Sequence, residues 1–220
     1  CTRGGSMIKL YDLSSSPYAA RVRIQILLKD LPIELVEPPF ALRSSEFLQA
    51  FPLGKLPLLQ LHDGSTIAES TVIMDYLEAL FPKAPLIPPS PISRANNSML
   101  VRYADNHLAQ SLLPLFIEFM SFEKNKIGIT NKLENLQAEL NKLEALLTTQ
   151  PDFRQRSIQT GDICLAPVIY YAIELAGWFG KQEIINDLPA VFDWWQWINQ
   201  HPAVADTIAE IDRAHKAVIK

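Results

Sequence analysis

A cluster of prolines near the middle of the chain separates two segments with different patterns. Pro82, Pro85, Pro88, Pro89 and Pro91 lie close together. Because proline fixes φ and lacks a backbone donor, the cluster predicts a stiff linker rather than a helix or strand. We predict a first domain at residues 7–83, a linker at 84–92 and a second domain at 93–220. Residues 1–6 read as a vector-derived leader, with Met7 as the native start.

The segment before the prolines alternates short apolar runs with helical patterns. Its order is strand, helix, strand, then strand, strand, helix, in the ranges Ile8–Tyr11, Tyr18–Lys29, Ile33–Val36, Leu58–Leu61, Ser65–Ile67 and Ser70–Phe81. A strand-helix-strand start implies a parallel pair, and the turn at His62-Asp63-Gly64 implies an antiparallel hairpin. The pattern therefore predicts an α/β domain with a mixed four-stranded sheet.

The segment after the prolines carries helical patterns only. Ser93 is predicted to cap a long helix that runs to about Phe122. Leucines from Leu133 to Leu147 form a stripe on a second helix, and Ile163–Ala176 is apolar enough to be a central buried helix. Two further helices are predicted, at Val191–Asn199 and from Ala203 to about Lys216. The second domain is therefore predicted to be all-α.

The composition excludes several classes of function. Net charge is -4, with 20 basic and 24 acidic residues, which disfavours binding to nucleic acid or an anionic membrane through bulk charge. No apolar run is long enough to span a bilayer. Cys1 and Cys164 cannot build a disulfide scaffold, so we expect a cytoplasmic protein. The four histidines lack metal-ligand spacing, so no metal is expected, and the glycine-rich loops of nucleotide-binding proteins are absent.

The first segment that could carry chemistry lies between the first strand and the first helix. Ser16-Pro17 is typical of a helix start, with Ser16 as the cap and Pro17 in the first turn. A cap is the simplest interpretation. The alternative is that the serine hydroxyl donates a hydrogen bond to an anion, which the partial positive charge of the helix end also attracts.

Two later segments have the same double interpretation. Pro57 stands directly before an apolar strand, where a cis Leu56–Pro57 peptide would turn the Leu56 backbone outward to pair with a bound peptide; an ordinary edge-strand proline is the simpler alternative. Glu69-Ser70 begins a helix. Either residue could cap it, or Ser70 and the helix end could bind a carboxylate while Glu69 binds an ammonium group.

In this order and spacing, the three segments resemble the cytosolic glutathione transferase family over the whole chain from Met7. The strongest match is Gly54-Lys55-Leu56-Pro57 with the run from Ile67 to Leu77. The resemblance implies a thioredoxin-like domain followed by a helical domain. It also implies glutathione as a substrate, a hydrophobic electrophile as its partner in a detoxification reaction, and a homodimer.

The resemblance assigns roles to individual residues. The run from Ser16 to Val22 is similar to serine-type transferases, so Ser16 would stabilise the glutathione thiolate. Glu69 and Ser70 would hold the γ-glutamyl end, and Leu56 would pair its backbone with the cysteinyl unit. Lys55 and Arg43 would meet the glycyl carboxylate. Ser14, Ser15 and Tyr11 are alternatives to Ser16.

Two other functions stay open. The run Arg21-Val22-Arg23-Ile24 is similar to that of glutathione-dependent isomerases of the maleylacetoacetate type, although their cysteine is missing here. The alternative from another class is an interaction protein that keeps the fold without catalysis. Retention of Ser16, Lys55, Glu69 and Ser70 together argues against that alternative.

The second domain is expected to supply the electrophile pocket. The candidates are Tyr103, His107, Phe116 and Met120, and Asp105 could reach the partner subunit's glutathione. The family's capping motif in the central helix is altered here, because Cys164 and Pro167 occupy the places expected for its hydroxyl and aspartate. Either Thr160 or Asp162 is expected to take over the cap, and Cys164 is expected to be a small core residue.

Overall fold

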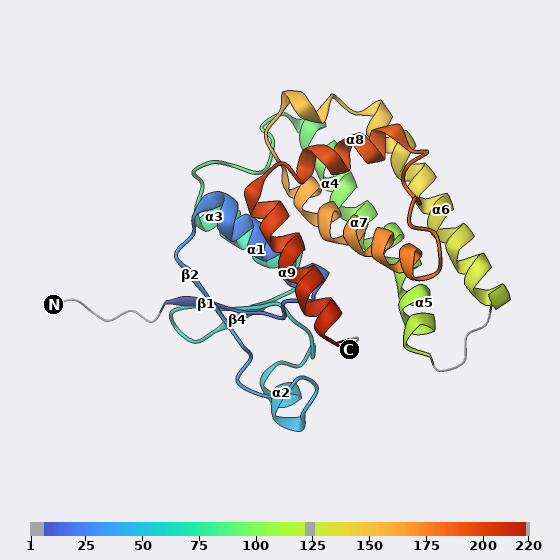
Figure 1. The fold of residues 1–220 in the computed structure, drawn as a ribbon. Coiled ribbons are helices and arrows are strands. Elements are labelled where there is room, and N and C mark those ends of the chain that lie inside the picture. The colour runs from blue at the N-terminus through green and yellow to red at the C-terminus, as the bar shows by residue number, and fades with distance from the viewer. Residues whose placement is uncertain (1–6, 122–125, 219–220) are drawn as a thin grey trace. The chain divides into compact units, whose positions relative to one another are not determined.

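The computed structural model describes residues 7–121 and 126–218 and divides the chain into two compact units (Figure 1). The first unit joins Cys1–Pro85 to Asp206–Lys220, and the second is Leu86–Ala205. This division differs from the predicted domains at the end of the chain, where residues from Asp206 onward group with the first unit. One physical reason is an ion pair between Arg23 and Glu210, whose Nε and Oε2 atoms are 3.5 Å apart.

The first unit contains the predicted mixed four-stranded sheet. Its elements are β1 (Ile8–Tyr11), α1 (Pro17–Lys29), β2 (Ile33–Val36), α2 (Ser45–Ala50), β3 (Leu58–Gln60), β4 (Thr66–Ala68) and α3 (Ser70–Leu80). The strand order is β2-β1-β3-β4, with β1 and β2 parallel and the other pairs antiparallel. Helices α1 and α3 lie together on one side of the sheet, and α2 lies on the other (Figure 1). The predicted α/β fold is confirmed.

The core of the first unit has a part on each side of the sheet. Ala19, Val22 and Ile24 of α1 and Ile73 and Leu77 of α3 are fully buried. Around α2, the buried aromatic pair Phe47–Phe51 packs with ring centroids 5.1 Å apart against Tyr11 and Leu58. The short helix α2 is not predicted from the sequence. It begins because Ser44 caps it, with Oγ accepting from the Phe47 N–H at 3.1 Å.

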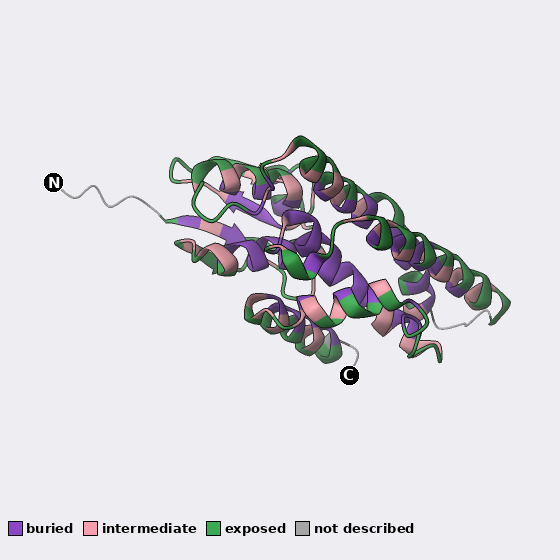
Figure 2. Ribbon diagram, turned by 90° about the horizontal axis from the view of Figure 1, so that it is seen from above, coloured by how far each residue is buried: buried purple, intermediate pink, exposed green. Residues whose placement is uncertain are grey.

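The second unit is helical throughout its described regular structure, as predicted. Its elements are α4 (Pro91–Tyr103), a π-helical turn (Ala104–Leu108), α5 (Ala109–Met120), α6 (Lys126–Thr149), a 3₁₀ turn (Phe153–Gln155), α7 (Thr160–Trp178), α8 (Pro189–Ile198) and the start of α9 (Pro202–Val218). Helix α7 packs against α4, α5 and α8 and is buried along most of its length. Figure 2 shows buried residues on the strands and on the inward faces of the helices.

The long helix predicted after the prolines begins earlier than expected and is not continuous. Ser90, not Ser93, is its N-cap, because Ser90 Oγ accepts from the Ser93 N–H at 3.2 Å and Pro91 fits the first helical position. The π-helical turn then interrupts the α-helical pattern between α4 and α5. The predicted end at Phe122 lies outside the described residues.

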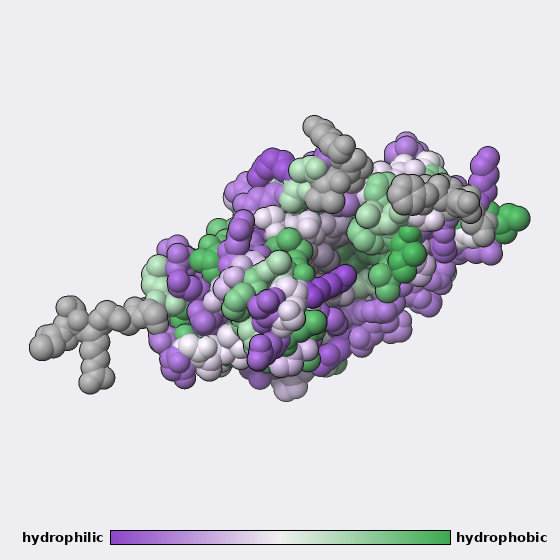
Figure 3. Space-filling model, turned by 90° about the horizontal axis from the view of Figure 1, so that it is seen from below, coloured by the Kyte–Doolittle hydropathy of each residue, from purple (hydrophilic) through white to green (hydrophobic). Residues whose placement is uncertain are grey.

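Apolar side chains also reach the surface. In the first unit Leu53 and Val72 are more than half exposed, and in the second unit Ile92, Ile117 and Met120 are. On the face drawn in Figure 3, apolar residues form separate patches among hydrophilic ones. None of the helices within residues 7–121 and 126–218 combines the length and the hydropathy that a membrane crossing requires.

Candidate functional site

The predicted glutathione-binding segments leave the sheet at one edge. Tyr11, the last residue of β1, pairs with Val36 at the end of β2 and with Leu58 at the start of β3. Leu58 also pairs with Ala68, the last residue of β4. The segment after β1, the segment after β2, the residues before β3 and the start of α3 therefore meet at this edge. The topology brings Ser16, Leu56 and Glu69 to the same end of the sheet.

A hollow of about 410 Å³ lies at this edge of the first unit. Two residues singled out from the sequence line this hollow. They are Leu56 and Ser14, and Ser14 is one of the alternatives to Ser16 as the serine of the site. The other lining residues are Asp12, Leu13, Glu37, Pro38, Pro39, Phe40, Ala41 and Leu42. These residues are not predicted as site residues. The signal that could have identified them is the parallel pairing of β1 and β2, which places the segments after both strands side by side.

Ser16 is the N-cap of α1, as predicted. Its Oγ accepts a hydrogen bond from the Ala19 N–H at 3.2 Å, and its own N–H donates to the Leu13 carbonyl at 2.8 Å. Because the oxygen accepts from the helix, the hydroxyl proton can be directed to another acceptor. The half-buried side chain combines a hydroxyl donor with the positive end of a helix, which suits an anion.

The alternatives to Ser16 lie in different surroundings. Tyr11 is buried within β1, and its hydroxyl donates to Gln60 Oε1 at 3.1 Å. That bond occupies its proton within the sheet. Ser14 is exposed and Ser15 is half-buried in the loop before the helix. Ser16 is the member of the group that caps α1.

The turn before β3 has a cis Leu56–Pro57 peptide, one of the two alternatives that the sequence left open. Leu56 is half-buried and packs against the cluster around Tyr11 and Phe47. The Lys55 side chain is exposed. Gly54 precedes it with φ of 63°, and a Cβ there would come within 2.8 Å of Leu48 Cδ2. Both the backbone conformation and the close approach require glycine at this position.

Glu69, at the start of α3, adopts an uncommon backbone conformation. Its φ is 69° and its ψ is 118°, in a region that non-glycine residues rarely occupy. None of the described side chains caps α3, while Ser70 is buried at the first helical position. The first N–H groups of a helix need partners, so a helix start without a side-chain cap is suited to a bound carboxylate. Backbone strain of this kind often occurs at ligand-binding positions.

Arg43 lies in the segment between β2 and α2. Its side chain is exposed, and it has a positive φ of 65° directly before the α2 cap Ser44. Like Leu42, it follows β2 on the side of the sheet edge that carries the hollow. Its place in the chain is compatible with contact to an anion at this edge.

The four candidates in the second unit differ in exposure. Tyr103 is buried, and its hydroxyl approaches the Glu139 carbonyl oxygen at 2.6 Å and the Glu139 carboxylate at 3.1 Å. Burial and the neighbouring carboxylate raise the pKa of Tyr103 well above its usual value. The exposed His107 ring stacks on Tyr103 at 5.2 Å. Phe116 and Met120 are exposed on α5, which leaves their side chains accessible to an apolar ligand.

A cluster of polar residues lies at the start of α7. Asp162, fully buried, accepts from both Arg156 terminal nitrogens at 2.5 and 3.0 Å, from the Gln159 N–H at 2.9 Å and from the Trp194 indole at 3.0 Å. Asp162 is therefore the residue that takes over the cap. Thr160 instead accepts from the Asn97 amide at 2.7 Å. Cys164 is buried in α7, as expected for a small core residue.

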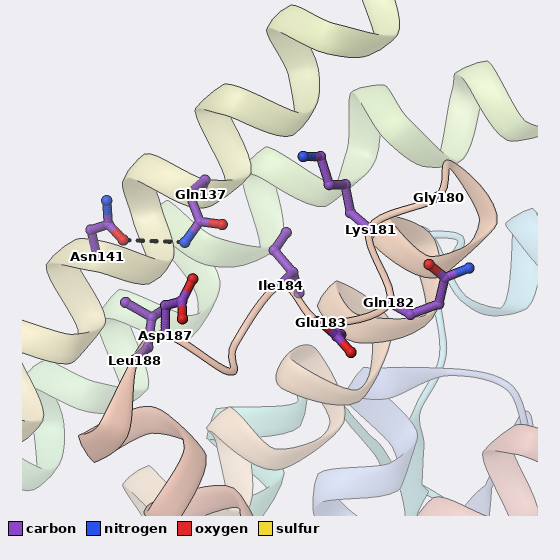
Figure 4. A pocket seen from close by; sticks show the side chains of 9 residues that line it. All are labelled: Gln137, Asn141, Gly180, Lys181, Gln182, Glu183, Ile184, Asp187 and Leu188. Carbon is purple, nitrogen blue, oxygen red and sulfur yellow. Dashed lines mark hydrogen bonds between the residues drawn. The ribbon is translucent and has the colours of Figure 1, made fainter.

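A second hollow, of about 480 Å³, lies in the second unit between α6 and the residues before α8 (Figure 4). Gln137 donates to Asn141 at 3.2 Å on its α6 side, and Lys181, Ile184 and Asp187 come from the other side. None of the predicted site residues lines it. Within the described parts of the chain, no three His, Cys, Asp or Glu side chains are grouped so that they could hold a metal ion.

Comparisons with known proteins agree with this geometry. Residues 10–85 match the family described as glutathione S-transferase, N-terminal domain. The chain is 26% identical over 204 residues to glutathione S-transferase U6 of Arabidopsis thaliana, covering 91% of this chain and 88% of that protein. It is 25% identical over 205 residues to glutathione S-transferase omega-1 of Sus scrofa, covering 90% and 79%. The crystal structure of a tau-class glutathione S-transferase from mango, Mangifera indica, has the same fold, with a TM-score of 0.80, 22% identity and 98% of both chains covered.

Proposed function

We propose that this chain is a cytosolic glutathione transferase, because residues 10–85 match the glutathione S-transferase N-terminal domain family. In this proposal Ser16 stabilises the glutathione thiolate for attack on a hydrophobic electrophile. The observation that supports the proposal is the sheet topology, in which the segments that carry Ser16, Leu56, Glu69 and Ser70 leave the sheet at the same edge. Those four positions supply a hydroxyl donor, backbone pairing groups, a carboxylate and a helix start. Together they match the chemistry of a thiol peptide with one ammonium and two carboxylate groups.

The free energy that Ser16 would have to contribute follows from the change in the thiol pKa. A free thiol has a pKa near 8.5, and lowering it by about two units needs roughly 2.7 kcal/mol of differential stabilisation. A charge-assisted hydrogen bond from the Ser16 hydroxyl and the positive end of α1 can together supply this amount. The thiolate is the nucleophile. It would attack an electrophilic carbon and displace a leaving group or add across a polarised double bond.

The other residues would hold the two ends of glutathione. Glu69 would accept from the γ-glutamyl ammonium, and the first N–H groups of α3 with Ser70 would bind the adjacent carboxylate. The Leu56 backbone would pair with the cysteinyl unit. Lys55 and Arg43 would meet the glycyl carboxylate. The apolar part of the electrophile would contact Leu13, Phe40 and Leu42 around the sheet-edge hollow.

Ser16→Ala tests the proposal. It should lower kcat by about 100-fold and change the KM for glutathione little, because it removes stabilisation of the thiolate rather than of the peptide. Ser14→Ala is the matched control two residues earlier and should leave kcat near the wild-type value. If Ser14→Ala gives the loss instead, the hydroxyl assignment is wrong. Wild-type protein that neither binds immobilised glutathione nor lowers the pKa of its thiol would contradict the enzyme proposal itself.

The family relationship also leads us to propose a homodimer. The mass in solution, measured by light scattering at several protein concentrations, tests this. A single species near the chain mass of 24.8 kDa at all concentrations would contradict it.

A further inference from the structure

Arg23 is a buried cation that holds the loop carrying the serines. Its side chain lies on α1, with 2% of the residue exposed. Nη1 is 2.6 and 2.8 Å from the two Asp12 carboxylate oxygens, and Nη2 donates to the Ser14 carbonyl at 3.0 Å. Nη1 also approaches the Leu13 carbonyl at 3.5 Å. One guanidinium thus binds three consecutive residues of the loop that ends at Ser16.

The geometry of α1 explains why residue 23 can reach that loop. Arg23 lies seven positions after the Ser16 cap, which is close to two helical turns, so both lie on one face of the helix. Helical side chains point back toward the helix N-terminus, and arginine is long enough to span the distance. The helix therefore holds its own entry loop twice, through the Ser16 cap and through Arg23.

The burial of this charge makes the contact a constraint rather than a surface ion pair. A buried guanidinium needs its charge and its donors satisfied, and breaking such a pair is strongly destabilising. The planar guanidinium of Arg23 fixes the Asp12 carboxylate and the Ser14 carbonyl relative to each other, which a lysine ammonium cannot do. Glu210, 49% exposed in its side chain, also approaches the guanidinium, with its Oε2 atom 3.5 Å from Arg23 Nε.

We propose that Arg23 is a positioning residue that sets the Ser14–Ser16 loop, and thereby the Ser16 hydroxyl, for stabilisation of the glutathione thiolate. This inference rests on the proposed function. Asp12 and Ser14 are both lining residues of the sheet-edge hollow, so the same contacts also fix one wall of the site. Arg23 itself is not a lining residue of this hollow and acts through the loop.

The test is Arg23→Lys, measured by the pKa of the bound glutathione thiol and by the split between kcat and KM. We expect the thiol pKa to rise toward that of free glutathione, so that activity appears at higher pH than in the wild type. The kcat should fall by about 10- to 100-fold, because small misplacements of a supporting group have effects of that size. The KM for glutathione should change by less than about threefold, since the groups that bind its two ends are untouched.

A matched control separates positioning from general loss of stability. Lys29 is another buried cation on α1, with Nζ 2.9 Å from Glu78 Oε1 and its side chain 1% exposed, but it faces α3 rather than the loop. Lys29→Met should lower the unfolding midpoint and leave the thiol pKa unchanged. If Lys29→Met shifts the thiol pKa as much as Arg23→Lys does, or if Arg23→Lys leaves both thiol pKa and kcat at wild-type values, the inference is overturned.

A second variant keeps the test decisive if Arg23→Lys folds poorly. The double variant Asp12→Asn with Arg23→Met removes both charges, so no lone charge is left buried, while the tether to Ser14 is lost. It should fold and show the raised thiol pKa, and a wild-type pKa in this folded variant would overturn the inference. A wild-type protein that does not lower the thiol pKa would instead contradict the proposed function, which makes the two failures distinguishable.

Discussion

The N-termini of α3 and α7 differ in whether side chains of the protein surround and cap the first turn of the helix. At α7 a buried aspartate, a neighbouring arginine and an indole surround the first turn, and Asn97 Oδ1 accepts from the Gly161 N–H at 2.7 Å. At α3 none of the described side chains caps the helix, and Glu69 is held at a positive φ. The first arrangement satisfies the helix end with the protein's own groups. The second leaves it available at the edge where the proposed site lies.

This difference separates stability from binding. Helix ends leave several N–H groups without partners, and satisfying them within the protein contributes to folding. If these N–H groups instead bind a ligand carboxylate, they stabilise the complex with the ligand rather than the free protein. We therefore expect substitutions at α7 to change mainly the free energy of unfolding and substitutions at α3 to change mainly the affinity for glutathione.

The largest effect should come from Asp162→Ala. It leaves Arg156, the Gln159 N–H and the Trp194 indole without their shared acceptor, and should lower the free energy of unfolding by about 3–5 kcal/mol. Urea denaturation followed by tryptophan fluorescence measures this. The matched control is Asp193→Ala, because Asp193 pairs with Arg154 at 2.7 Å while both side chains are about half exposed. That surface pair should contribute less than about 1 kcal/mol, and an equal cost for the two variants would contradict the comparison.

The next effect should come from Glu69→Gly. Glycine tolerates the positive φ, so the free energy of unfolding should stay within about 1 kcal/mol of the wild type. The Kd for glutathione should rise by at least about tenfold, because a charge-assisted hydrogen bond contributes roughly 1.5–3 kcal/mol. Calorimetry and urea denaturation measure the two quantities. Glu69→Ala should lose affinity equally but be less stable than Glu69→Gly, because alanine keeps the positive-φ strain that glycine relieves. A Glu69→Gly variant with unchanged affinity would remove the proposed role of the carboxylate.

The smallest effect should come from Ser90→Ala, which measures how much a single side-chain cap contributes to stability. Loss of the bond from the Ser93 N–H to Ser90 Oγ should lower the free energy of unfolding by about 1 kcal/mol. Ser93→Ala removes only the 2.7 Å bond between the two hydroxyls and should cost less. Thermal unfolding of the two variants under identical conditions shows which of the two serines caps α4. A larger loss for Ser93→Ala would favour the helix start predicted from the sequence.

Local signals explain which features could be predicted from sequence. The strands and the Ser16-Pro17 helix start each depend on neighbouring residues, and both are present. The cis Leu56–Pro57 peptide is one of the two alternatives that the local sequence left open. The Asp162 cap could not be chosen over Thr160, because the partners that distinguish them are distant along the chain: Trp194 donates to Asp162, while Asn97 donates to Thr160.

The features missed by prediction have weak or distant signals. Helix α2 is less than two turns long, and the π-helical turn has no pattern of its own. The roles of Asp12 and Arg23 were missed because an acidic residue after a strand and an arginine inside an amphipathic helix are each ordinary. Their meaning comes from the 2.6 Å contact between them.

The grouping of α9 beyond Asp206 with the first unit matters for protein engineering. The first unit is discontinuous along the chain, since Leu86–Ala205 is inserted between its two parts. A chimera with one crossover in the proline-rich segment would combine the first 85 residues of one parent with the last helix of another. That would replace the buried Ile211 and the Glu210 contact to Arg23 with foreign residues. Chimeras that exchange specificity between such proteins therefore need two crossovers, one after Pro85 and one before Asp206.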